Sequence, residues 1–163
     1  MAAPTQINPA TEADVPVIFQ LICKLAEYEH LSHEVMATED LLRLHLFGPH
    51  PAAEAIVAKV EGKTVGFALF FTTFSTFVGR PGIWLEDVFV LPEFRRGGIG
   101  EALLRHVAGI ACERNCGRLE WSVLDWNEPA LRFYKKIGAQ PMSEWTIQRV
   151  TGEALEKLAC DVD

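Results

Sequence analysis

The sequence predicts one mixed α/β domain, residues 1–163, with helices flanking a mostly antiparallel sheet that contains one parallel pair of strands. Two β-rich runs flank Glu61-Gly62-Lys63, which indicates an antiparallel hairpin. An apolar strand leads through a glycine-rich loop into a helix, and another strand follows, which requires a parallel crossover. With 163 residues, 49% of them hydrophobic, the chain can bury a core without disulfides or metals.

Capping patterns define the helices of the first third of the chain. Thr11 and Asp14 resemble a capping box, and apolar residues then recur at helical spacing, which predicts a helix over residues 12–29. Thr38 precedes two acidic residues that suit a first helical turn, and Gly48 ends the apolar pattern. A second, shorter helix is therefore expected between Thr38 and Gly48.

The central strands follow from β-rich composition and turn residues. Residues 55–60 and 65–73 form the two arms of the predicted hairpin. Residues 75–82 contain two glycines and a proline, and we expect a loop there. The apolar run 83–90 is expected to be the strand that enters the glycine-rich loop.

The second half alternates helices and strands. A helix over residues 101–115 and a strand over residues 118–124 complete the predicted crossover, and ligands favour such a point of an open sheet. A short helix follows over residues 130–137. Residues 145–150 predict a further strand and residues 151–159 a C-terminal amphipathic helix.

Composition restricts the class of ligand. The formal charge of −7 disfavours nucleic acid and anionic membranes and would attract a small cation. The N-terminal residues lack a basic and apolar leader, so we expect a cytoplasmic protein. The four cysteines are scattered without a C-x-x-C pair, which fits reduced thiols. The five histidines lack ligand spacing, and we predict no metal.

The loop after the apolar strand has the pattern R-x-x-G-x-G from Arg95 to Gly100. A glycine-rich turn into a helix N-terminus presents backbone N–H groups and the positive end of the helix dipole to a phosphate. We expect Gly97 and Gly98 to allow positive φ, and Arg95 or Arg96 to contact the phosphate. The alternative is an ordinary glycine-rich turn.

A second motif makes the interpretation specific. The strand at 118–124 leads to W-N-E-P-A-L-R-F-Y, which runs from Trp126 to Tyr134. Together with R-x-x-G-x-G, this segment resembles the GNAT superfamily of acetyl-CoA-dependent N-acetyltransferases. Residues 25–29, 84–90 and 125–139 resemble its diamine branch, the spermidine/spermine and thialysine N-acetyltransferases. The resemblance implies a GNAT-type sheet with a splayed parallel strand pair, and acetyl-CoA as co-substrate.

The resemblance also implies which residues hold the cofactor. The splayed strand would offer its backbone to the pantetheine arm, and the two motifs would hold the rest. The implied residues are Val88, Phe89, Val90, Arg95, Arg96, Gly97, Gly98, Ile99, Gly100, Glu101, Asn127, Pro129 and Ala130.

Acetyl transfer to an amine needs a base for the ammonium and an acid for the departing thiolate. Glu86 is the candidate base, because acidic residues are rare in such an apolar strand, although a salt bridge would also explain it. Glu86 and Asp87 point to opposite faces unless a bulge intervenes. By resemblance Tyr134 is the general acid, and its alternative is a core aromatic.

The candidate acceptor site is acidic. Its residues, by resemblance and by charge, are Tyr28, Glu29, Glu86, Asp87 and, more weakly, Glu144. For Glu29 a solvated helix end is the alternative. The segment after Ala139 is shorter than in relatives of this branch, so the choice among diamines, polyamines and thialysine stays open.

Two other functions compete with a small-amine acetyltransferase. One is acetylation of another amine, such as a peptide or amino acid, and the other is a non-catalytic acyl-CoA-binding module. No cysteine falls in the motifs, which favours direct attack in a ternary complex over an acyl-enzyme. The resemblance implies a homodimer, and the expected partner is a small-molecule amine.

Overall fold

The computed structural model describes residues 4–160 of the chain. By their contacts the residues form two compact units, Met1–Ser122 (unit 1) and Val123–Asp163 (unit 2), and each is described by itself. Unit 1 contains the sheet, and unit 2 contains the Trp-Asn-Glu-Pro motif. The assignment of residues 1–163 to one domain stays a prediction.

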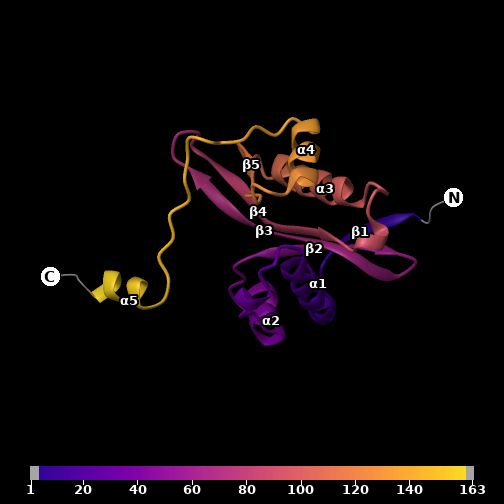
Figure 1. Ribbon diagram of the computed structural model, residues 1–163, viewed down its shortest axis with the longest axis horizontal. Coiled ribbons are helices and arrows are strands. Elements are labelled where there is room, and N and C mark those ends of the chain that lie inside the picture. The colour runs from indigo at the N-terminus through magenta and orange to yellow at the C-terminus, as the bar shows by residue number, and fades with distance from the viewer. Residues whose placement is uncertain (1–3, 161–163) are drawn as a thin grey trace. The chain divides into compact units, whose positions relative to one another are not determined.

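Unit 1 is built on a five-stranded sheet in the order β1-β2-β3-β4-β5 (Figure 1). The strands are β1 (Thr5–Pro9), β2 (Glu54–Val60), β3 (Lys63–Ser75), β4 (Arg80–Val90) and β5 (Leu119–Glu120). The first three pairings are antiparallel and the last, between β4 and β5, is parallel. The mostly antiparallel sheet with one parallel pair is therefore confirmed.

The parallel pairing is short. Only Ile83↔Leu119 and Trp84↔Glu120 are in register, although a strand was predicted through residue 124. Beyond Trp84 the β5 side of β4 has no strand partner in the described sheet. The backbone of β4 from Leu85 to Val90 therefore has no strand partner on one edge, and at Val90 the carbonyl oxygen accepts from Arg95 Nε.

Helices cover both faces of this sheet. The helices α1 (Val15–Tyr28) and α2 (Glu39–Phe47) lie on one side, and α3 (Ile99–Glu113) lies on the other (Figure 1). These ranges confirm the predicted helices to within a few residues. The largest fully buried side chains between the layers include Phe67, Phe70, Ile18, Leu21, Ile56, Ile83, Leu85, Leu103 and Val107.

A buried carboxylate fixes the start of α1. The Thr11 backbone N–H and hydroxyl both donate to Asp14 Oδ2 at 2.9 Å, and Lys59 Nζ lies 3.1 Å from Asp14 Oδ1. Burial opposes ionisation of Asp14, but the Thr11 hydrogen bonds and the Lys59 charge outweigh it and lower its pKa. The predicted capping box therefore also links a short 3₁₀ turn, η1 (Glu12–Asp14), to β2.

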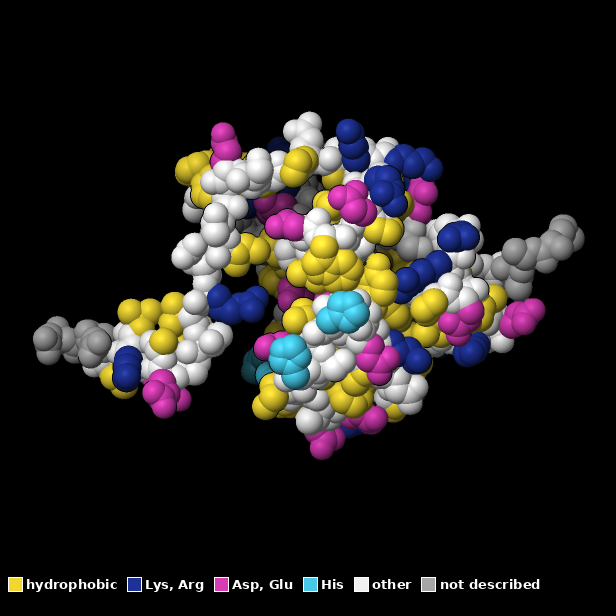
Figure 2. Space-filling view, in the orientation of Figure 1, with side chains coloured by type: hydrophobic (Ala, Val, Ile, Leu, Met, Phe, Trp, Pro, Cys, Tyr) yellow, Lys and Arg dark blue, Asp and Glu magenta, His cyan; other side chains and the backbone are white. Residues whose placement is uncertain are grey.

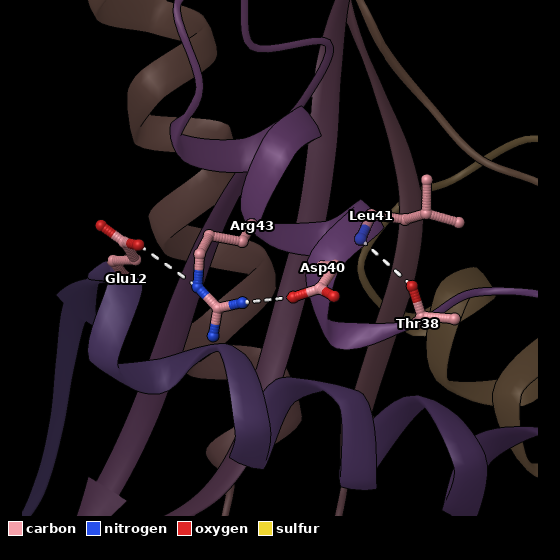
Figure 3. A network of polar contacts seen from close by, with 5 residues as sticks. All are labelled: Glu12, Thr38, Asp40, Leu41 and Arg43. Atoms are coloured by element: carbon pink, nitrogen blue, oxygen red, sulfur yellow. Dashed lines mark hydrogen bonds and ion pairs between the residues drawn. The ribbon is translucent and has the colours of Figure 1, made fainter.

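The second helix begins at the predicted cap. Thr38 Oγ1 accepts from the Leu41 N–H at 3.2 Å, and Arg43 joins Glu12 and Asp40 at 3.2 and 3.0 Å (Figure 3). Arg43 therefore connects α2 to η1. A shallow hollow of about 310 Å³ lies beside this ion pair, lined also by Leu44, Phe47 and Gly48.

The hairpins agree with the sequence at one turn and differ at the other. Glu61 and Gly62 both take positive φ, 51° and 79°, and join β2 to β3 as predicted. The loop predicted over residues 75–82 is wrong in extent, because β4 already begins at Arg80. A Cβ on Gly82 would lie 2.8 Å from Thr73 Oγ1 and 3.3 Å from the Arg118 carbonyl oxygen. This glycine therefore serves close strand packing rather than a turn.

Two other differences concern strands. Thr5–Pro9 forms β1 by pairing with β2, although its short polar sequence predicted nothing regular. The strand predicted over residues 145–150 is wrong, because these residues have no regular structure. A strand needs a hydrogen-bonded neighbour, and the described part of unit 2 contains none. Unit 2 otherwise holds the two predicted helices, α4 (Glu128–Lys136) and α5 (Gly152–Cys160).

Candidate active site

A β-bulge in β4 decides how its two carboxylates are arranged. Leu69 on β3 pairs with Asp87, whereas Phe70 pairs with Leu85, so Glu86 is the extra residue. Leu69 and Phe71 lie on one face of β3, and Phe71 pairs with Trp84. Asp87 therefore lies on the Trp84 face of the sheet, where a regular strand would have placed it on the other face.

The side chain of Glu86 is held on the same face. The indole N–H of Trp84 donates to Glu86 Oε2 at 2.9 Å. Glu86 is exposed, and Leu85 between them is buried on the opposite face. Trp84 thus orients the candidate base toward solvent, where a ligand can reach it. The alternative of a salt bridge is not seen for Glu86 among the described residues.

A third carboxylate belongs to the same cluster. Glu29, the residue after α1, is close enough for its charge to act on Asp87. Burial raises the pKa of Asp87 to about 6, and the charges of Glu86 and Glu29 add to the rise. Burial also raises the pKa of Glu29. We call Glu29, Glu86 and Asp87 the acidic cluster; unit 1 brings together these three predicted acceptor residues.

The raised pKa of Asp87 predicts a pH-dependent gain of stability in Asp87→Asn. Above pH 6 the folded protein holds an ionised Asp87 against burial and like charges, and the penalty disappears as pH falls from about 6 toward 4. Asparagine removes that penalty. We expect urea unfolding to show Asp87→Asn more stable than wild type at pH 7.5, by at most about 2 kcal/mol because water reaches the side chain.

At pH 4 the two proteins should unfold at nearly the same urea concentration, because Asp87 of the folded protein is then protonated and carries no charge against burial. A difference of the same size at both pH values would contradict the burial argument.

The glycine loop has the conformation of an anion-binding turn, with one change from the prediction. Gly98 takes φ 80° and is the N-cap of α3. The second residue of this loop with positive φ is Arg96, at 68°, and not Gly97 as predicted. A 3₁₀ turn, η3 (Pro92–Phe94), precedes this loop and has Arg95 as its C-cap. A Cβ at Gly98 would meet nothing within 4 Å, so its surface is open to a ligand.

This loop has the features of a site for a phosphate or pyrophosphate group. The first turn of α3 presents backbone N–H groups that lack intrahelical acceptors, and its dipole favours an anion. Ile99 is buried and anchors the turn, while the Glu101 carboxylate pairs with Arg105 at 2.8 Å. Since a carboxylate repels phosphate, Glu101 could contribute only its backbone N–H.

The other candidate cofactor residues of unit 1 surround the end of β4. Phe89 and Val90 are buried and Val88 is half-buried, so only their backbone could serve a ligand. Arg95 Nε donates to the Val90 carbonyl oxygen at 2.9 Å. Its guanidinium carbon lies 4.8 Å from the ring centroid of Tyr28 and 5.3 Å from that of Phe89.

The candidate residues of unit 2 lie on and before α4. Asn127 Oδ1 accepts from the Ala130 N–H at 3.4 Å, and Pro129 lies in the first turn, so the cap is formed as predicted. Tyr134 is on this helix, with its ring 5.5 Å from that of Phe133. Glu144 lines a hollow of about 170 Å³ with Met142 and Trp145. The approach of Tyr134 to Glu86, which are in different units, stays a prediction.

Sequence reasoning did not identify two contacts of unit 1. Trp84 orients Glu86, and its signal was available, because residues two apart on a strand share a face. Arg95 lies against Tyr28, which is 67 positions earlier, and no local pattern indicates that pair.

Among residues 4–160, no group of three histidine, cysteine or acidic side chains is placed to hold a metal. Histidine and apolar side chains gather over the α2 region of unit 1 (Figure 2) without forming such a group. Within the same residues, every helix is too short or too polar to cross a bilayer.

Comparison with known proteins gives consistent results. Residues 18–139 match the acetyltransferase (GNAT) family. Mouse thialysine N-epsilon-acetyltransferase is 38% identical over 168 residues, which cover 96% of this chain and 98% of the relative. The L-ornithine N5-acetyltransferase of Arabidopsis thaliana is 31% identical, covering 94% and 87%. An integron cassette protein from the Vibrio cholerae mobile metagenome superposes with a TM-score of 0.79 at 31% identity, covering 95% and 97%.

Proposed function

The chain belongs to the GNAT acetyltransferase family and is an N-acetyltransferase; we propose that it transfers acetyl from acetyl-CoA to a primary amine of a small cationic acceptor. The acceptor class is a diamine, a polyamine or a thialysine-like amino acid. The attack is direct, within a ternary complex.

The observation that carries the choice of acceptor is the acidic cluster. Glu86 and Asp87 lie on one face of β4, the strand that leads to the glycine loop, and Glu29 is close enough for its charge to act on Asp87. After the reacting amine has lost its proton, an acceptor with a second ammonium still carries a positive charge that would relieve their mutual repulsion, whereas a monoamine carries none. Relatives named for thialysine and ornithine, which each carry two amino groups, support the same class.

The proposed proton path begins at the amine. Glu86, oriented by Trp84, takes a proton from the acceptor ammonium, directly or through water. Asp87, whose pKa is about 6, is better matched to neutral pH than an ordinary carboxylate and shares that role with Glu86. Tyr134 donates a proton to the departing thiolate. Glu29 and Tyr28 hold the distal ammonium.

Bound acetyl-CoA would supply the acetyl group as an activated thioester. The backbone of the Gly98 turn and the first turn of α3 would hold its pyrophosphate, aided by the arginines of the loop. The edge of β4 from Val88 to Val90 has no strand partner and would hold the pantetheine arm, although the Val90 carbonyl already accepts from Arg95. Asn127, Pro129 and Ala130 would contact the cofactor from unit 2.

The test is thiol release from acetyl-CoA with a panel of amines. Thialysine, ornithine, 1,3-diaminopropane and spermidine represent the proposed class, and propylamine is the matched control without a second ammonium. A peptide with a free N-terminus represents the main rival substrate. We expect turnover of one or more of the proposed amines, with kcat/KM at least about tenfold above that of propylamine, as about 1.4 kcal/mol of charge interaction would give.

Two results would overturn the proposal. A higher kcat/KM for the peptide than for every diamine would assign the protein to peptide acetylation. Tight binding of acetyl-CoA without turnover of any amine would favour an acyl-CoA-binding module.

A homodimer and a cytoplasmic location belong to the same proposal, by resemblance to diamine acetyltransferases. Phe74 and Phe77 at the β3–β4 turn are 64% and 96% exposed and offer apolar surface for a subunit contact. Light scattering after size-exclusion chromatography tests the assembly: a mass of twice 18.2 kDa is expected, and a monomer at micromolar concentration would contradict it.

A further inference from the structure

The two adjacent arginines of the glycine loop have different surroundings. The Arg95 side chain is engaged three times, with the Val90 carbonyl and with the rings of Tyr28 and Phe89. For Arg96, whose backbone is in the left-handed region, no hydrogen bond or ion pair of the side chain is found among the described residues. Sequence alone gave both arginines the same role, as alternative phosphate contacts.

Arg95 touches the parts of unit 1 that would meet both substrates. Tyr28 is the last residue of α1, and Glu29 of the acidic cluster follows it. Val90 ends β4, three positions after Asp87. Arg95 itself belongs to the loop that would hold the pyrophosphate. One side chain thus connects the cofactor loop, the end of β4 and the helix end that carries Glu29.

We propose that Arg95 is a positioning residue that couples the cofactor loop to the acceptor corner, and that Arg96 is the arginine that contacts phosphate. The inference rests on the proposed function. Because it contacts the rings of both Tyr28 and Phe89, the guanidinium holds the end of α1 against β4 and so fixes Glu29 beside Asp87. An ordered loop keeps Arg95 in that place, and binding at the loop therefore favours amine binding at the cluster.

The expected effects are moderate, because Arg95 is exposed. A cation–π contact at such a site corresponds to about a two- to fivefold change in an equilibrium constant. Arg96→Ala should weaken coenzyme A binding several-fold, as loss of a charge-assisted phosphate contact does, and should change KM for the diamine less than Arg95→Ala does. Arg95→Ala should raise KM for the diamine and change coenzyme A affinity less than Arg96→Ala does.

A double-mutant cycle separates coupling from direct contact. Tyr28→Leu alone would lower kcat/KM for two reasons: it removes a residue of the proposed acceptor site, and it removes the ring that contacts Arg95. In the cycle of Arg95→Ala with Tyr28→Leu, we expect the combined loss to be about two- to fivefold smaller than the product of the single losses. Tyr28→Phe keeps the ring. In the cycle with this variant, Arg95→Ala should lower kcat/KM by the same factor as it does in the wild type.

The experiment measures coenzyme A affinity by calorimetry and diamine KM and kcat by thiol release for all these variants. Arg43→Ala breaks the ion pairs of Arg43 with Glu12 and Asp40 and controls for a general loss of stability. It should change neither the coenzyme A affinity nor the kinetic constants for the diamine. The inference would be wrong, with the proposed function intact, if the losses of kcat/KM in the Tyr28→Leu cycle simply multiplied. It would also be wrong if Arg95→Ala and Arg96→Ala lost coenzyme A affinity equally. A wild-type protein that acetylates no amine would overturn the proposed function and the inference with it.

Discussion

Replacing Tyr134 by phenylalanine is expected to lower kcat for acetylation of a diamine by about 100-fold or more at neutral pH. The substitution removes the one proton that we assign to the departing thiolate, and general acid catalysis contributes about 10² to 10⁴ in rate. The ring and its packing against Phe133 remain, so the fold of α4 should be unchanged. Steady-state thiol release measures kcat, and calorimetry measures coenzyme A affinity, which should stay within about twofold.

Phe133→Leu is the matched control for this experiment. It disturbs the same ring pair but leaves the hydroxyl of Tyr134 in place. We expect kcat to stay within a few-fold of wild type. If Tyr134→Phe kept most of its kcat while Phe133→Leu lost it, Tyr134 would be a packing residue and the acid would have to be sought elsewhere.

Replacing Glu86 by glutamine is the second large effect that we expect, with kcat/KM for the diamine lower by about 100-fold. Glutamine keeps the size of the side chain and can still accept from Trp84, but it cannot take a proton. Because the charge of Glu86 contributes to the raised pKa of Asp87, that pKa should also fall. The residual activity of the variant should therefore extend to lower pH.

The pH dependence of kcat/KM measures both effects. The wild-type rate should rise with pH through an acidic limb near pH 6, as Asp87 ionises, and this limb should move to lower pH in Glu86→Gln. Glu39→Gln, in the first turn of α2 and outside the acidic cluster, is the control for loss of one negative charge. An unchanged profile with unchanged kcat/KM in Glu86→Gln would remove Glu86 from the proton path.

Much of the fold could be predicted because its signals are local. The Thr11–Asp14 capping box, the Thr38 cap and the Glu61-Gly62 turn each involve residues within a few positions of one another. Such contacts depend only on residues that are close in the sequence. The sequence pattern is therefore enough to predict a helix start or a turn. The short strands were harder to predict from the sequence. Residues 5–9 form β1 because they pair with the edge of β2, whereas residues 145–150 have the composition of a strand but no paired neighbour in the described part of unit 2.

The candidate site also has parts that local sequence patterns predicted and parts that they did not. The glycine loop and the Asn127 cap were predicted from motif and spacing, and their local geometry agrees, apart from the exchange of positive φ between Gly97 and Arg96. The types of residue at the acceptor site were also visible, since a carboxylate pair inside an apolar strand is unusual. Their common orientation was not visible.

The sequence by itself determined the family, the helices and hairpin, and the residue types needed for acetyl transfer to an amine, because these depend on composition and short-range spacing. Only the tertiary structure decided that Glu86 and Asp87 share one face, because the bulge that turns Asp87 arises from the register of β4 on β3. Tertiary structure likewise brought Glu29 to Asp87 and Arg95 to Tyr28. Those contacts join segments far apart in the chain, and their geometry follows from packing α1 on the sheet, which no local pattern encodes.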